Sequence, residues 1–104
     1  MTNLPIKKAE KIIKHYGTAH QKIKLCEECA ELIQAVCKSL DNGSADNITE
    51  DMIEEMADVQ IMLMQFRRIL PNYQYDRLYE IQRQKLDRQL QRIESEDDND
   101  SGTA

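Results

Sequence analysis

The sequence contains few residues that interrupt helices. It has only three glycines and two prolines in 104 residues, whereas a fold of many short strands needs a turn residue at every connection. Leu, Ile, Met, Glu, Lys, Gln and Arg, which all favour helices, dominate instead. We therefore predict an all-α fold, a four-helix bundle-like domain over residues 1–94 with a central antiparallel helical hairpin.

The chain also lacks a long apolar run. Its first residues, MTNLPIKKAEK, contain no sustained apolar run, whereas a signal peptide or a membrane span requires one. The sequence therefore predicts a cytoplasmic protein that has no membrane partner.

An excess of positive charge is missing as well. The net charge is -5, and five of the acidic residues lie in the last eleven positions: Glu94, Glu96, Asp97, Asp98 and Asp100. Residues 1–93 are balanced, so the basic face typical of nucleic-acid-binding proteins is not expected. Residues 95–104 contain almost no apolar side chains, and we predict that they form a disordered acidic tail.

Cysteine and histidine are scarce. Cys26, Cys29 and Cys37 are odd in number, which suits a reducing compartment better than a disulfide framework. No second ligand pair accompanies Cys26 and Cys29, so a structural zinc site is not indicated, and we interpret the cysteines as small core residues. Neither His15 nor His20 follows a glutamate by three residues, which argues against a di-iron carboxylate bundle.

Turn signals divide the chain into helical segments. Gly17 suits the end of a first helix, Thr18 and Gln21 have the spacing of a capping box, and Pro71 stops a helix. The polar stretch DNGSADN, residues 41–47, has the composition of a turn. The predicted helices cover residues 5–17, 18–40, 48–70 and 73–94.

Two acidic phrases, EECAE at residues 27–31 and EEMAD at residues 54–58, occur in the second and third segments. At 100° per residue, Glu28 and Glu31 share one face of their helix, and Glu55 and Asp58 share one face of theirs. The third segment is apolar on its other sides, so we expect it to be buried almost all round.

A short loop would fold these two segments into an antiparallel hairpin. Glu28 and Asp58 are equally far along the chain from Gly43, as are Glu31 and Glu55. All four carboxylates should therefore meet at the helix interface. Such a cluster requires a cation, and oxygen ligands without histidine or cysteine favour Mg²⁺, with Mn²⁺ as an alternative.

A calcium EF-hand does not fit the loop. A loop that begins at Asp41 places Asp46 where a glycine is required and Met52 where a glutamate ligand is required.

The strings QKIKLCEECAEL (21–32) and EEMADVQIML (54–63) together resemble the MazG-like all-α nucleoside triphosphate pyrophosphohydrolases. This family is marked by ExxE on one helix and ExxD on the next. The resemblance implies Mg²⁺-dependent hydrolysis of a ribo- or deoxyribonucleoside triphosphate to the monophosphate and pyrophosphate, a reaction suited to clearing nucleotide pools. It also implies assembly as a homodimer or homotetramer, with Glu28, Glu31, Glu55 and Asp58 as metal ligands.

Further site residues follow from the same resemblance. Glu27 could orient a water as a base beside Glu28, or it could form a solvated helix flank. The match extends to Gln21 and Lys24, and Lys24 could contact a phosphate or simply pair with Glu28. KLDR resembles the basic motif of the family's last helix, which makes Lys85 and Arg88 candidate phosphate ligands or, alternatively, part of a solvated basic face.

A second class of function remains open. A methionine-rich third helix is also typical of partner-binding surfaces, so the chain could be a non-enzymatic helical bundle, either an assembly protein or a regulatory partner, whose acidic cluster holds a structural cation. The sequence does not predict which base or sugar an enzyme would prefer.

Overall fold

The computed structural model describes residues 4–102, and within this range all regular structure is helical. The helices are α1 (Pro5–Tyr16), α2 (Thr18–Asp41), α3 (Glu50–Ile69) and α4 (Asn72–Gly102). No strand occurs among these residues, which confirms the predicted all-α class and the number of helices. None of the described helices combines the length and the apolar character needed to cross a membrane.

The four helices belong to two compact units. The first ends at Ile69 and contains α1, α2 and α3, and the second begins at Leu70 and contains α4. The sequence predicted one domain that included all four helices. Pro71 lies at the boundary, where its missing N–H interrupts helical hydrogen bonding, and its carbonyl accepts hydrogen bonds from Gln74 N and Tyr75 N that begin α4.

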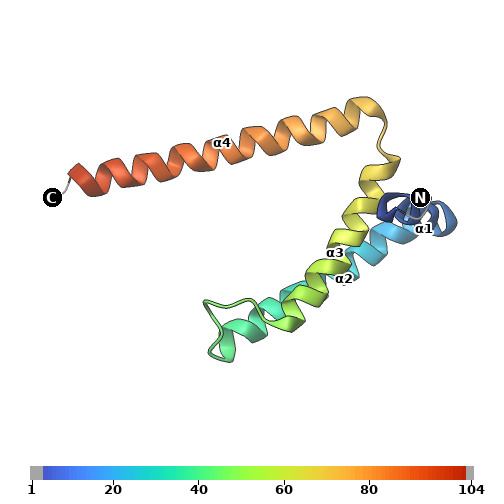
Figure 1. The fold of residues 1–104 in the computed structure, drawn as a ribbon, viewed down its shortest axis with the longest axis horizontal. Helices are drawn as coiled ribbons and strands as arrows, with labels where there is room; N and C mark the ends of the chain where they lie inside the picture. Colours follow the sequence, from blue (N-terminus) through green and yellow to red (C-terminus); the bar gives the residue numbers. More distant parts are fainter. Residues whose placement is uncertain (1–3, 103–104) are drawn as a thin grey trace. The chain divides into compact units, whose positions relative to one another are not determined.

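Helix α4 is longer than predicted. It continues past Glu94, where we expected the disordered tail to begin, and residues 95–102 are helical (Figure 1). Neither glycine nor proline occurs between Pro71 and Gly102, so nothing in the backbone interrupts the helix. Residues 103 and 104 of the predicted tail lie outside the described range.

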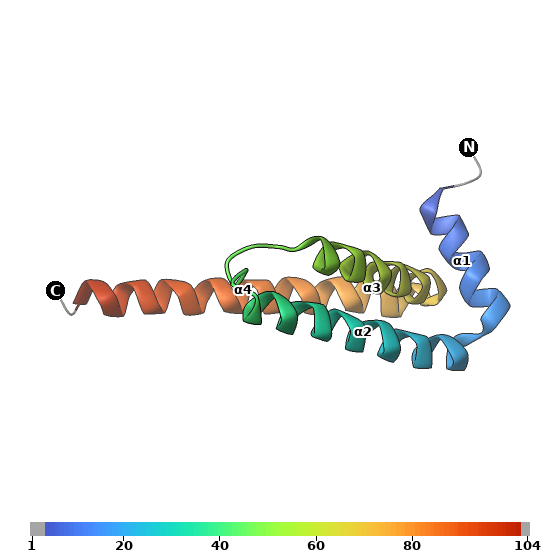
Figure 2. The same ribbon diagram turned by 90° about the horizontal axis from the view of Figure 1, so that it is seen from below.

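Helices α2 and α3 form the predicted antiparallel hairpin and run side by side (Figure 2). Gly43, in the connecting loop, has a φ of 77°, a conformation that favours glycine. Thr49 Oγ1 accepts a hydrogen bond of 3.3 Å from Met52 N and so caps α3. Helix α3 consequently begins at Glu50, two residues later than predicted.

Helix α1 crosses the end of this hairpin opposite the loop (Figure 2). It buries Ala9 and Ile13, while Glu10 pairs with Lys14 at 2.6 Å and with Arg68 of α3. The hydrogen bonds from these two cations lower the pKa of Glu10 to about 2. Gly17, with a φ of 90°, ends α1 and redirects the chain into α2.

The seam between α2 and α3 is lined by polar and small side chains. The buried positions of α2 are Gln21, Glu28, Ala35 and Ser39. The first three are spaced by seven residues, so they share one face of the helix. Gln21 Nε2 donates a 2.8 Å hydrogen bond across the seam to Gln65 Oε1. The predicted capping box is therefore not formed: Gly17 is the N-cap of α2, without a side-chain cap.

Within the single chain, α3 is not buried all round as predicted. The side chains of Ile53, Met56, Ile61 and Leu63 are 44% to 49% exposed. Two helices pack on α3 in this unit, and two neighbours cannot cover a helix that is apolar on most of its sides.

The prediction that the cysteines are core residues was wrong. All three are free; Cys26 and Cys37 are exposed, and Cys29 is half-buried. Because α3 packs on the face of α2 that carries Glu28 and Ala35, Cys26 and Cys37 lie on faces that it does not cover.

The buried amide pair provides a test of the hairpin register. Gln21 and Gln65 are 3% and 2% exposed, and they are equally far along the chain from Gly43. We expect Gln65→Leu to lower the free energy of unfolding by about 1 to 3 kcal/mol, because the Gln21 amide is left buried without an acceptor. Adding Gln21→Leu should recover part of that loss, measured by urea denaturation as a double-mutant cycle. Strict additivity of the two changes would contradict this pairing.

Candidate metal centre

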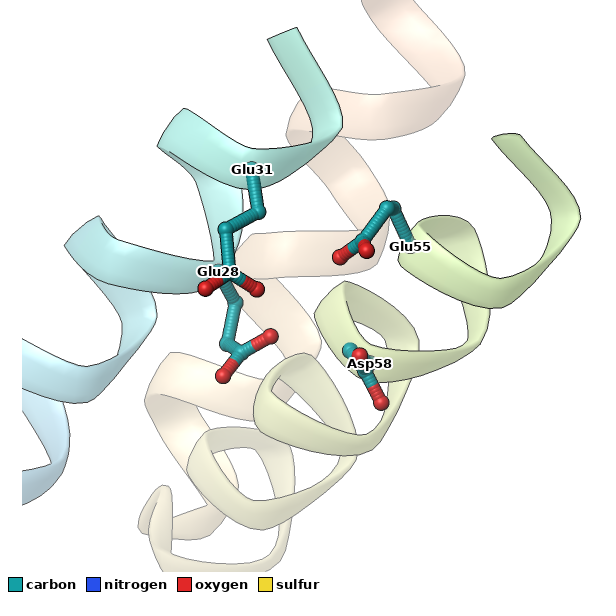
Figure 3. Close-up of side chains that lie close together, drawn as sticks. All are labelled: Glu28, Glu31, Glu55 and Asp58. Carbon is teal, nitrogen blue, oxygen red and sulfur yellow. The ribbon is translucent and has the colours of Figure 1, made fainter. Parts of the chain in front are cut away.

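The two halves of the acidic repeat meet across the hairpin. Glu28 and Glu31 extend from α2, and Glu55 and Asp58 face them from α3 (Figure 3). One carboxylate oxygen from each residue lies within 4.8 Å of those from the other three. The convergence predicted from their equal distances to Gly43 is therefore present.

Two of these carboxylates have a buried oxygen that is unsatisfied. Glu28 is 7% exposed, and neither its Oε2 nor that of Glu55 has a hydrogen-bond partner among the described residues. A buried acceptor without a donor is costly. Neighbouring ionised carboxylates cannot act as donors, whereas a cation would satisfy both oxygens together.

The other two carboxylates leave the cluster open to solvent. Glu31 and Asp58 are exposed, while Glu55 is half-buried. A cation bound here could thus keep water molecules or take ligands from solution, as Mg²⁺ usually does.

Electrostatics show that the cluster is unfavourable when fully ionised. Burial, followed by repulsion from Glu31 and Asp58, raises the pKa of Glu55. A raised pKa in the folded state means that Glu55 contributes to stability below its ordinary pKa, and that this contribution is lost as pH rises through the folded value. Ionisation of Glu55 at neutral pH therefore opposes folding unless positive charge balances it.

Lys24 lies beside the cluster. Its Nζ is 3.2 Å from Glu28 Oε1 and 3.6 Å from Glu27 Oε2, and the pairing with Glu28 is the main reason why the pKa of Lys24 is raised. Glu27 is exposed and lies outside the group of four. In this conformation Lys24 balances part of the charge on Glu28.

The remaining sequence candidates lie elsewhere. Gln21 is buried in its hydrogen bond with Gln65, so here its amide connects the helices. Lys85 and Arg88 are exposed on α4 and belong to the second unit.

A pocket next to the cluster contains residues that the sequence analysis did not select. It is lined by Glu31, Gln34, Ala35, Lys38, Asp51 and Glu55. Of these, Lys38 is the one cation. In the sequence, Lys38 could have been noticed because it follows Glu31 by seven residues, which places both on one face of α2. Exposed lysines on helices are common, however, so this spacing does not separate a binding lysine from an ordinary surface lysine.

Comparisons with family models, with curated proteins and with solved structures found no match to this chain. The likeness to MazG-like enzymes thus rests on the acidic motifs and their spacing.

Proposed function

We propose that the protein is a Mg²⁺-dependent nucleoside triphosphate pyrophosphohydrolase. The observation that carries this proposal is the pair of buried carboxylate oxygens, on Glu28 and Glu55, that lack donors inside a cluster of four converging carboxylates. Buried carboxylates without a partner are unfavourable, and a bound cation would pair with them.

The ligand set supports Mg²⁺ or Mn²⁺ as that cation. All four groups are carboxylates, and hard oxygen ligands suit these ions better than they suit zinc or copper. A bound ion would supply positive charge for phosphate oxygens and would acidify a water molecule. Glu28, Glu31, Glu55 and Asp58 would hold it.

The proposed reaction breaks the link between the α and β phosphates. A water oxygen forms a bond to the α-phosphorus, the bond from that phosphorus to the bridging oxygen breaks, and pyrophosphate leaves with its electron pair. The proton released by water needs a base. Glu27 is exposed next to Glu28 and could accept it, with Lys24 holding the Glu27 carboxylate in place.

A release assay tests this function directly. Purified protein with Mg²⁺ should release pyrophosphate, and no orthophosphate, from at least one common or modified ribo- or deoxyribonucleoside triphosphate. Addition of EDTA should abolish the release. A folded protein that releases no pyrophosphate from any of these nucleotides would refute the proposal.

The proposal includes self-association, as a homodimer or homotetramer. Besides the exposed apolar side chains of α3, α4 carries Leu86, Leu90 and Ile93, which are 52% to 58% exposed and share one face. Burying such faces against a second copy would remove them from water. Light scattering should give a mass of two or four chains, and a mass of one chain would contradict this part of the proposal.

The exposed apolar residues of α3 also favour a second candidate, a non-enzymatic helical protein that binds another protein and uses a structural cation. This candidate predicts stabilisation by Mg²⁺ without any nucleotide turnover. The release assay therefore separates the two functions.

A further inference from the structure

The pocket beside the carboxylate cluster has an uneven distribution of charge. Three carboxylates line it, Glu31 and Glu55 of the cluster together with Asp51, against one cation, Lys38, and the amide of Gln34. Ala35, also in the lining, is buried and has the smallest side chain there, so it leaves room next to the cluster.

Lys38 is available to bind a ligand. No ion pair involves Lys38 among the side chains described, those of residues 4–99, although Glu31, Asp51 and Glu55 line the same pocket. Lys24, on the same face of α2, is already paired with Glu28 and Glu27. Of these two lysines near the cluster, Lys38 is thus the one whose charge is not balanced by a carboxylate.

The spacing along α2 fits a phosphate between the cluster and Lys38. Lys38 follows Glu31 by seven residues, which is about 10 Å along the helix axis. Side chains on a helix lean toward its N-terminus, so Lys38 leans back from its own Cα toward Glu31. Once a cation occupies the carboxylates, an anionic group in the pocket would have positive charge on both sides.

We propose that Lys38, with Gln34, binds the β and γ phosphates of the substrate, the part that leaves as pyrophosphate. This inference rests on the proposed function, because it takes the carboxylate cluster as the metal site. It makes the pocket of Glu31, Gln34, Lys38 and Asp51 the leaving-group end of the site.

The test compares Lys38→Gln with Lys22→Gln, a matched loss of one exposed lysine about 160° away around α2. Calorimetry would measure binding of inorganic pyrophosphate with saturating Mg²⁺, and binding of Mn²⁺ alone. We expect Lys38→Gln to weaken pyrophosphate binding by about tenfold or more, since a charge-assisted hydrogen bond is lost. Lys38→Arg should keep most of the affinity, and Lys22→Gln should match the unmodified protein.

Binding of Mn²⁺ should be unchanged or tighter in Lys38→Gln, because the substitution removes a positive charge near the cluster. Equal pyrophosphate affinity in the two glutamine variants would overturn the proposal, as would an unmodified protein that binds Mn²⁺ without binding pyrophosphate. A failure of the proposed function has a different result. If pyrophosphate binding depends on Lys38 but no nucleotide is hydrolysed, the anion site is supported and the proposed reaction is rejected.

Discussion

Glu28→Gln and Asp58→Asn should each reduce the rate of pyrophosphate release by more than about a hundredfold. Each substitution keeps the size of the side chain and removes one charged ligand from the cluster. Loss of a group that only supports a metal ligand typically costs about 10- to 100-fold in activity or metal affinity, so loss of a ligand itself should cost more. Initial rates at saturating Mg²⁺ and nucleotide provide the measurement.

Glu54→Gln is the matched control for these variants. Glu54 is exposed, immediately precedes Glu55, and lies outside the group of four, so its loss should change the rate by no more than a few-fold. Circular dichroism should show all three variants folded, because Glu28→Gln and Asp58→Asn relieve repulsion within the cluster and Glu54→Gln changes an exposed side chain. Activity that is indifferent to Glu28 and Asp58 would place the chemistry elsewhere in the molecule.

Mg²⁺ should raise the melting temperature of the protein substantially. A ligand that binds only the folded state stabilises it by about 2.7 kcal/mol at 100 times its dissociation constant. The expected cause is relief of repulsion among the four carboxylates, two of which have buried oxygens without donors. Thermal melting in EDTA and then in increasing Mg²⁺ measures the shift, with NaCl at matched ionic strength as the control for screening.

The same shift should be smaller near pH 5 than near pH 7.5, because protons compete with the metal for the Glu55 carboxylate, whose pKa is raised by burial and by its acidic neighbours. In Glu31→Gln/Asp58→Asn, a double variant that removes two of the ligands, the Mg²⁺-dependent shift should be largely lost. A melting temperature that does not change up to tens of millimolar Mg²⁺ would count against a shared metal site, whatever the protein does with nucleotides.

The sequence was sufficient to predict the hairpin and its register. Turn residues at 41–47 separate two long helical patterns, and equal distances from Gly43 pair Glu28 with Asp58 and Glu31 with Glu55. The position of the turn and the helical periodicity can both be predicted from residue types along the chain, without knowing which side chains pack across the seam. The clustering of the four carboxylates in the structure follows from them.

The inward face of each helix was harder to predict. Apolar periodicity marks a different stripe of α2 from the one that is buried, because Gln21 and Glu28 are in the seam. Periodicity predicts burial from apolar character, and it fails where polar groups are buried with a partner such as Gln65. The long C-terminal part of α4 was missed for a related reason, since composition predicts whether residues form a core and not whether an unbroken helix continues.

The length of the loop between α2 and α3 can change more easily than the length of either helix. Gln21 and Gln65 bind each other across the seam, and the carboxylate pairs lie closer to the loop. Contacts between α2 and α3 therefore specify how the two helices align. Doubling the length of a flexible loop costs only about 0.6 kcal/mol in closure entropy. Insertions among residues 42–49 are thus compatible with the same four-carboxylate geometry, so a reporter peptide could be inserted in this connection without displacing any of the four carboxylates.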